Sequence, residues 1–217
     1  MEWCDKFRRL TIRANAETII DTEKSLEFGA DGIGLCRTEH MFFEGERIIP
    51  MREMIMSDTK QGRERALSKL ITYQISDFEA LFLLLKDKPI TVRLLDPPMH
   101  EFLPKSDIEI TELGNAIGVS PAHIKEMLLK LSESNPMLGH RGVRLGLSYP
   151  EIYEMQVEAI LRASYNLQKN EKLGVSPEIM IPLVMNSEEL RQMKEVLTEK
   201  ISQLEGLKPG DPKDKTG

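Results

Sequence analysis

The feature that most constrains the fold of this sequence is a repeated alternation of short apolar strands with longer amphipathic helices. Five short runs, rich in β-branched and apolar residues and bounded by turn residues, are typical of strands. They cover 10–14, 32–36, 90–95, 142–145 and 179–184. This alternation predicts an α/β fold with a parallel sheet and helical crossovers.

Longer segments between these strands carry apolar residues at the spacing of one helix face. Helices are therefore predicted at 18–28, 62–74, 76–87, 150–170 and 187–204. Thr18 occupies an N-cap position and Gly29 follows the last helical residue, which sets the ends of the first helix. Between the third and fourth strands, 108–117 and 120–132 predict a helical hairpin that is broken at Gly118.

The number of predicted strands leaves two architectures open. Five strands can complete a small, open, doubly wound sheet, whereas a (β/α)8 barrel typically needs about 250 residues. The chain has 217 residues, and 206–217 are almost all polar, glycine or proline, which predicts a disordered tail. The choice between the two architectures therefore depends on the chemistry of the strand ends.

Composition limits the ligands that the chain can attract. The formal net charge is −6, so neither nucleic acid nor an anionic membrane is an expected partner. The apolar runs are far shorter than the roughly 20 residues that span a bilayer. Two cysteines, Cys4 and Cys36, are typical of free thiols in a reducing compartment, and the cytoplasm is the expected location. Any anion that binds must be attracted by a local cluster of cations.

Arginine recurs at the carboxyl end of the predicted strands. The first four strands carry, in order, Arg13, Arg37, Arg93 and the pair Arg141 and Arg144. In parallel α/β folds the loops at this edge converge on the ligand site. Guanidinium groups present a planar fork of donors to phosphate or carboxylate, and several together would repel one another without an anion. The pattern predicts a site for a small, multiply charged anion such as a phosphorylated carboxylic acid.

A purely structural role for the same arginines stays open at this point. A single arginine at a strand end commonly forms an ion pair with a nearby carboxylate. Glu39 and Asp96 are available for such pairs, and Glu17 is a less favoured partner. No metal site is predicted, because metal-ligand spacing does not connect the histidines that follow strand ends, which are His40, His100 and His140.

Six segments of the sequence carry a more specific signal. They read EWCDKFRRLTIRANAET, FGADGIGLCRTEHMFF, YQISDFEALF, ITVRLLDPPMHEFLP, NPMLGHRGVRLG and PEIMIPLV. In this order they resemble the phosphoenolpyruvate (PEP)/pyruvate-binding domain of the pyruvate, phosphate dikinase family, over nearly all of residues 2–184. Pyruvate, water dikinase and enzyme I of the sugar phosphotransferase system share that barrel and remain the alternative families. The continuation of the third strand into HEFLP favours the phosphate-dependent family.

The resemblance implies a fold and a domain organisation. The fold is an incomplete (β/α)8 TIM barrel with its first five strands, and the helical hairpin is inserted between strands three and four. This partial PEP-binding domain would occupy 10–205, entered by a linker helix in 1–9 and followed by the tail.

The resemblance also implies roles for the arginines. Arg37 and Arg93 fall on the family's substrate-binding positions. Arg141 and Arg144 lie in a matching motif and are expected to contact the phosphoryl group or to brace the pocket. The supporting residues of the site would be Asn15 and Asp96.

The family's chemistry implies a larger parent protein. In the family, an ATP-grasp domain loads a phosphohistidine domain, which exchanges its phosphoryl group with pyruvate in the barrel of a homodimer. ATP, pyruvate and phosphate thereby give AMP, PEP and diphosphate. The family's Mg²⁺ ligands and catalytic cysteine have no counterpart here, so the chain alone is expected to be inactive. The alternative of a different class is a non-catalytic anion-binding or assembly module with its first and last strands as open edges.

Overall fold

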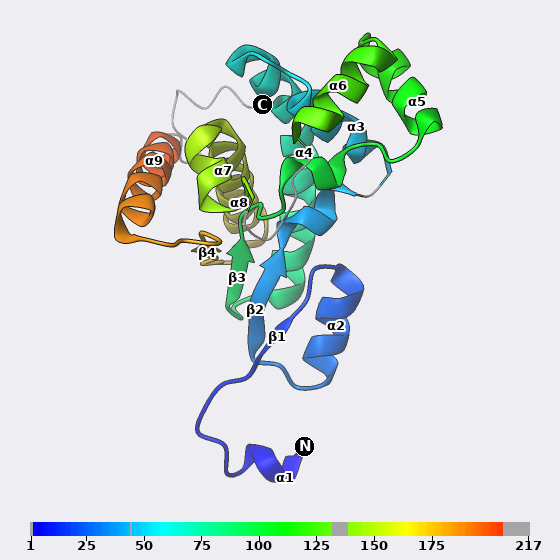
Figure 1. The fold of residues 1–217 in the computed structure, drawn as a ribbon. Helices are drawn as coiled ribbons and strands as arrows, with labels where there is room; N and C mark the ends of the chain where they lie inside the picture. Colours follow the sequence, from blue (N-terminus) through cyan, green and yellow to red (C-terminus); the bar gives the residue numbers. More distant parts are fainter. Residues whose placement is uncertain (1, 44, 132–138, 206–217) are drawn as a thin grey trace.

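Four parallel strands form the sheet of this chain (Figure 1). The structure, a computed structural model, describes residues 2–43, 45–131 and 139–205. In these residues the strands are β1 (Arg13–Asn15), β2 (Gly32–Arg37), β3 (Ile90–Arg93) and β4 (Glu178–Met180). They pair in the order β1-β2-β3-β4, and each pair is parallel. The predicted α/β class with a parallel sheet is confirmed.

Each strand is followed by a helix that packs on the helix of the next strand. These helices are α2 (Ile19–Glu27), α4 (Lys60–Leu85), α8 (Pro150–Glu171) and α9 (Ser187–Glu205). α2 contacts α4, α4 contacts α8, and α8 contacts α9. As the sequence predicts, Thr18 caps α2 by accepting a hydrogen bond from the backbone N–H of Asp21. The four helices therefore lie side by side in the same order as the four strands of the sheet.

The prediction of a strand at 142–145 is wrong. The structure has α7 (Val143–Ser148) there, so the described residues contain four strands instead of the predicted five. Gly142 has φ +58° and ψ −136°, a conformation that favours glycine and turns the chain. Its N–H donates to the carbonyl of Asp96 at 3.0 Å. The next backbone N–H donates to the carbonyl of Pro182 at 2.9 Å, so the segment bridges two loops instead of pairing along one strand.

A single helix, α4, replaces the two helices predicted at 62–74 and 76–87. The junction contains neither glycine nor proline, and the helix continues through it. Gln74 interrupts the apolar pattern at this point, yet its side chain is buried and its Nε2 lies 3.8 Å from Met41 Sδ. The polar residue therefore belongs to the buried face of one helix.

The remaining described elements lie in the connections. They are α1 (Glu2–Asp5), the 3-10 helices η1 (Thr38–Phe42), η2 (Gly45–Arg47) and η3 (Met99–Phe102), and α3 (Ile48–Ile55). α1 falls within the predicted linker segment, whose role, like the predicted domain bounds, stays a prediction. The predicted tail at 206–217 lies outside the described residues. No helix in the described ranges is long and apolar enough to cross a bilayer.

Two helices of the long connection between β3 and β4 pack on each other, α5 (Asp107–Ile117) and α6 (Pro121–Leu131). Ser106 caps α5 by accepting a hydrogen bond from the backbone N–H of Glu109. Gly118 ends the helix in the left-handed region, with φ +72°, which reverses the chain toward α6. The two helices lie in the region where the sequence predicts a hairpin.

The core lies between the sheet and helices α4 and α8. Phe78 and Phe82, one turn apart on α4, are fully buried and stack with ring centroids 5.8 Å apart. Ile33 of β2 and Val92 of β3 belong to the same buried cluster. Truncation of a buried phenylalanine to alanine typically costs about 3–5 kcal/mol. This packing holds the ends of β2 and β3 in fixed positions.

The sheet curves enough for its first and last strands to share a side-chain contact. Arg13 Nη1 on β1 lies 2.7 Å from Glu178 Oε2 on β4, and Thr91 on β3 donates to the same oxygen at 2.6 Å. On β2, Gly34 leaves room, since a Cβ there would lie 3.1 Å from Arg13 Cβ. Three strand spacings would separate β1 from β4 by roughly 14 Å in a flat sheet. The contact between Arg13 and Glu178 therefore indicates strong curvature.

Candidate functional site

The ends of β2 and β3 bring two of the predicted site arginines to the same level of the sheet. Arg37 is the last residue of β2 and Arg93 is the last residue of β3, and the two are partners in the parallel register. Beyond them, β2 continues into η1, and β3 continues into the loop that contains Asp96. The carboxyl edge of the sheet is therefore where the predicted site residues can meet.

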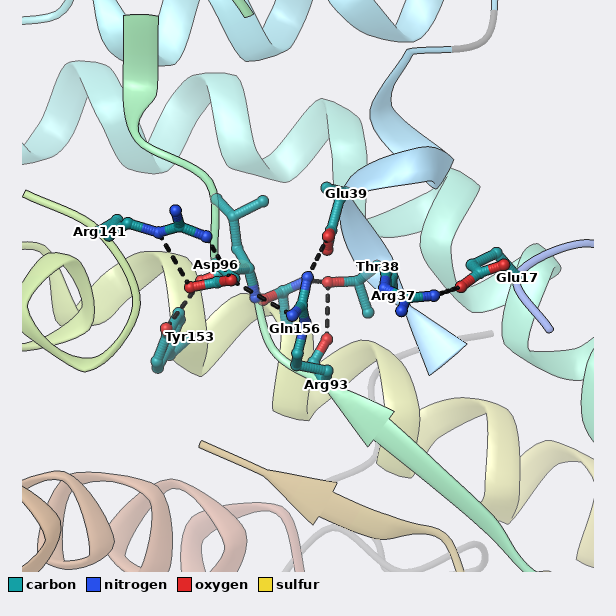
Figure 2. Close-up of polar contacts among 10 residues, drawn as sticks. Glu17, Arg37, Thr38, Glu39, Arg93, Asp96, Arg141, Tyr153 and Gln156 are labelled. Atoms are coloured by element: carbon teal, nitrogen blue, oxygen red, sulfur yellow. Dashed lines mark hydrogen bonds and ion pairs between the residues drawn. The ribbon is translucent and has the colours of Figure 1, made fainter. Parts of the chain in front are cut away.

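Asp96 connects Arg93 with Arg141 (Figure 2). Its buried carboxylate accepts two hydrogen bonds from Arg141, with Nη2 2.6 Å from Oδ2 and Nε 3.4 Å from Oδ1. Arg93 Nη1 lies 3.2 Å from the same Oδ2. Three predicted site residues, two from β3 and its loop and one from the segment before α7, thus meet at one carboxylate.

Glu39 occupies the other side of Arg93. It lies in η1, directly after β2, and its Oε1 forms an ion pair with Arg93 Nη2 (Figure 2). Its side chain is only 9% exposed. Arg93 is therefore held between two buried carboxylates, one from the end of β2 and one from the end of β3.

Arg37 turns toward a different partner, Glu17, in the connection between β1 and α2 (Figure 2). Arg37 Nη1 forms an ion pair with Glu17 Oε1, and the guanidinium side chain is 33% exposed. The expectation that Glu17 is a less favoured partner is wrong, because the chain after β1 brings this carboxylate to the end of β2. The sequence alternative of ion pairs at Glu39 and Asp96 is found for Arg93 and Arg141.

The arginines of the cluster are matched by carboxylates. Arg37 faces Glu17, and Arg93 and Arg141 share Asp96, with Glu39 as a further partner of Arg93. The mutual repulsion expected of several guanidinium groups is thereby removed. An incoming anion would have to compete with carboxylates that already face these groups.

A buried polar frame holds the end of β3, and sequence reasoning missed it. Gln156 on α8 accepts a hydrogen bond from the Leu95 N–H at 2.8 Å and donates to Thr38 Oγ1 at 2.9 Å. Thr38 in turn donates to the Arg93 carbonyl at 2.9 Å. Tyr153, one turn earlier on α8, donates to the Leu95 carbonyl at 2.7 Å. The frame thus fixes the backbone on both sides of the Arg93–Asp96 segment.

The sequence contains one signal that could have revealed this frame. Gln156 interrupts an otherwise apolar face of the helix predicted at 150–170, and it is fully buried. A buried amide needs hydrogen-bond partners, so its position predicts a polar partner nearby. Burial also raises the pKa of Tyr153 far above its usual range, so its hydroxyl stays protonated and donates.

Two other predicted site residues lie apart from the cluster around Asp96. Arg144 is on α7, and its Nη1 lies 3.3 Å from Met185 Sδ, in the connection between β4 and α9. Asn15 ends β1 and lines a cavity of about 540 Å³ together with residues of α2. Among the described residues that line this cavity, Asn15 is the only predicted site residue. The structure therefore brings together Arg93, Asp96 and Arg141, with Arg37 next to them.

Comparison with known proteins identifies the family. The family described as PEP-utilising enzyme, PEP-binding domain, matches residues 1–215. The chain belongs to this PEP-binding domain family. The match covers nearly the whole length of the chain, including the strand ends that carry the arginine cluster.

The chain is similar to parts of several curated enzymes. It is 47% identical to pyruvate, phosphate dikinase of Clostridium symbiosum over 211 residues, which cover 97% of this chain and 24% of that protein. It is 52% identical to pyruvate, phosphate dikinase of Rhizobium meliloti over 194 residues, which cover 89% of this chain and 22% of that protein. A chloroplastic pyruvate, phosphate dikinase of Flaveria pringlei is also 52% identical, over 88% of this chain and 20% of that protein. The chain thus spans about a quarter or less of the length of these relatives.

The carboxylates, histidines and thiols of the described residues do not form a set of ligands that fits a metal ion. In the part of the chain that the structure describes, no three His, Cys, Asp or Glu side chains gather as a possible metal site. Glu39 and Asp96 are both committed to guanidinium groups. The Mg²⁺ implied by the family resemblance therefore finds no ligand set among the described residues.

The thiol next to the cluster is not activated. Cys36, adjacent to Arg37, is buried, and its burial together with nearby carboxylates raises the pKa of its thiol to about 12. The thiol therefore stays protonated near neutral pH and is a poor nucleophile. The guanidinium groups of the cluster are donors of the kind that bind phosphate or carboxylate oxygens.

Proposed function

We propose that this chain is part of a pyruvate, phosphate dikinase and forms one side of its PEP/pyruvate site. The observation that carries the proposal is the cluster of Arg93, Asp96 and Arg141 at the carboxyl edge of the sheet, with Arg37 in register beside it. The high identity to pyruvate, phosphate dikinases supports the same assignment. The reaction of the whole protein would convert ATP, pyruvate and phosphate to AMP, PEP and diphosphate, by way of a phosphohistidine.

The role of this chain in that reaction would be electrostatic. Arg93 and Arg37 would bind the carboxylate and phosphoryl groups of PEP, and Arg141 would contact the phosphoryl group or hold Asp96 in place. One charge pair at 4 Å is worth roughly 4 kcal/mol at an effective dielectric constant near 20, before desolvation. Guanidinium groups held on strand ends spread the charge of a phosphoryl group in transfer and fix its direction. Arg144 and Asn15 would act only as outer supports of the pocket.

The architecture proposed for the whole domain is a (β/α)8 barrel, of which this chain would provide an arc. The order of the strands in the sheet follows the sequence without reversal, and the helices pack on each other in the same order. The curvature of the sheet, which brings Arg13 on the first strand into contact with Glu178 on the last, also supports this architecture. A doubly wound sheet would reverse its strand order at the ligand site. The α5 and α6 pair would be an insertion into this barrel.

The rest of the enzyme would lie outside the described residues. The remaining strands, the Mg²⁺ ligands, the phosphohistidine domain and the ATP-grasp domain would belong to the parent protein, which we propose to be a cytoplasmic homodimer. Nucleic acid and membranes are not proposed as partners. The length of the curated relatives, of which this chain covers at most 24%, supports a larger parent.

Titration of the 217-residue chain with PEP tests the proposal. Weak binding is expected, with a dissociation constant on the order of 1 mM, which corresponds to about 4 kcal/mol. Arg93→Ala and Arg37→Ala are each expected to weaken binding about tenfold or more. Arg191→Ala, which removes an exposed arginine paired with Glu188 on α9, is the matched control and should bind as the wild type does. Equal binding by all of these variants would exclude the site.

A second candidate function is a non-catalytic assembly module. The neutralisation of each clustered arginine by a carboxylate favours it, as do apolar side chains exposed beyond the edge strands, such as Leu10, Ile12 and Met185. Open sheet edges pair readily with another chain. This function would be supported if the chain associates with itself in sedimentation and binds no PEP.

A further inference from the structure

The pairing of Glu39 with Arg93 is incomplete on both sides. Glu39 uses Oε1 for its ion pair with Arg93 Nη2. Its second oxygen, Oε2, is buried and has no hydrogen-bond partner among the described residues. Arg93 Nε is likewise buried without a partner in the described part of the chain. A buried acceptor and a buried donor therefore stay unsatisfied at the centre of the cluster.

The geometry of a guanidinium explains why this pairing is poor. One edge of the group carries Nε and one terminal nitrogen, and it best binds two oxygens of the same carboxylate or phosphate. Glu39 offers one oxygen to Nη2 and none to Nε. An anion with two free oxygens could satisfy both donors of this edge, so Glu39 is a replaceable partner of Arg93.

Asp96 is not replaceable in the same way. Both of its oxygens bind Arg141, at 2.6 and 3.4 Å, whereas Arg93 contacts only Oδ2, at 3.2 Å. Its backbone carbonyl also accepts the Gly142 N–H. Asp96 therefore belongs to the frame of the site, and Glu39 is the carboxylate that an incoming anion meets as a competitor.

The backbone that carries Glu39 is fixed, so any exchange has to occur in its side chain. The preceding residue, Thr38, is buried and is held by the Arg93 carbonyl and by Gln156. Rotation of the Glu39 side chain is therefore the way in which its carboxylate can leave the guanidinium of Arg93. A negative charge held there opposes the binding of a second negative charge at the same arginine.

We propose that Glu39 is a specificity-determining residue that occupies Arg93 in place of the anionic ligand and gives up this guanidinium when PEP binds. This inference rests on the proposed function of the site. Glu39 lowers the affinity of the site for every anion, so weakly charged anions cannot displace it. A ligand with several charges and two free oxygens on one group, as in PEP, can displace it.

Removal of this charge should therefore strengthen binding. In Glu39→Gln the side chain keeps its size and loses its charge, and the dissociation constant for PEP is expected to fall by about fivefold or more in calorimetric titration of the full 217-residue chain. Inorganic phosphate should gain at least as much. Glu101→Gln is the matched control, because Glu101 is an exposed residue in η3, the 3-10 helix that follows β3 as η1 follows β2. This control should leave both dissociation constants unchanged.

The outcomes separate this inference from the function on which it rests. If the wild type binds PEP and Arg93→Ala does not, but Glu39→Gln binds with equal or lower affinity, the role of Glu39 is overturned and the proposed site stands. If neither the wild type nor Glu39→Gln binds PEP or phosphate, both fail. A merely structural Glu39 would lower the melting temperature and the affinity together when it is replaced.

A second measurement uses the wild-type chain and does not depend on the folding of a Glu39 variant. The Nε–H resonance of Arg93, assigned by its loss in Arg93→Lys, is expected to shift during titration with PEP as Nε gains a partner. An unchanged resonance at saturating PEP would overturn the exchange of partners.

Discussion

Asp96 binds Arg141 through both carboxylate oxygens, at 2.6 and 3.4 Å. The residue after Arg141 donates its backbone N–H to the carbonyl of Asp96 at 3.0 Å. Side chain and backbone of Asp96 therefore tie the loop after β3 to the segment that enters α7. Because Arg93 contacts the same carboxylate, this tie also sets the position of the arginine at the strand end.

Asp96→Asn should destabilise the chain and disorganise the arginine cluster. The substitution leaves Arg93 and Arg141 partly buried without their shared carboxylate, and loss of one partner of a buried ion pair costs about 3 kcal/mol. Urea denaturation should show a lower midpoint with an unchanged slope. Glu188→Gln, which removes a carboxylate from the exposed pair with Arg191, should change the midpoint little. Equal effects of the two substitutions would contradict the structural role of Asp96.

Gln156→Leu should destabilise the chain although leucine suits a buried helix face. The Leu95 N–H and the Thr38 hydroxyl would each lose a buried partner, at a cost of roughly 2 kcal/mol in the free energy of unfolding. Gln192→Leu on α9, where the amide is exposed and donates to Glu188, is the matched control. A Gln156→Leu chain as stable as this control would show that the polar frame is dispensable.

Gly142→Ala tests the turn that replaced a predicted strand. Its φ of +58° strains any L side chain, and the new Cβ would lie 2.7 Å from Leu183 Cβ and 2.9 Å from the Pro182 carbonyl oxygen. A loss of about 2 kcal/mol or more in the free energy of unfolding is expected. Gly174→Ala is the control, because a Cβ there meets no heavy atom of the described residues within 4 Å. A neutral Gly142→Ala substitution would contradict the geometry of this turn.

The sequence predicted the parts of the fold that depend on local chemistry. Thr18 and Gly118 fix helix ends through capping and the left-handed conformation, so α2 and the end of α5 were placed correctly. The segment at 142–145 looks like a strand because it mixes apolar and charged residues. Its conformation is instead set by hydrogen bonds to Asp96 and Pro182, which are distant in the sequence.

The candidate site was predictable in its residue types and in the carboxylates of Glu39 and Asp96, but not in the partner of Arg37. Parallel strands place Arg37 and Arg93 at the same edge, a result that follows from strand topology alone. The partner of Arg37, Glu17, depends on the path of the chain after β1, which no local pattern records. Arg144 lies apart from Arg141 because helix α7 begins between them. The sequence predicted a strand at this position, so this separation was not expected.

The pH dependence of stability should reveal a contact between the N-terminal segment and the loop before β2. Arg8 Nη1 lies 2.5 Å from Asp31 Oδ2, and the Ile12 N–H donates to the same oxygen at 2.8 Å. The Arg8 guanidinium is the main cause that lowers the pKa of Asp31 from 3.8 to about 2. A carboxylate with a lowered pKa stabilises the folded chain above its unfolded pKa, and this contribution is lost as the pH falls from about 4 to about 2. In Arg8→Ala, NMR titration of the Asp31 carboxyl should show a pKa that returns toward 3.8, and the loss of stability over this pH range should become less steep. Arg9→Ala, which removes a neighbouring charge, should leave the Asp31 titration unchanged, and an unchanged titration in Arg8→Ala would show that this contact does not form in solution.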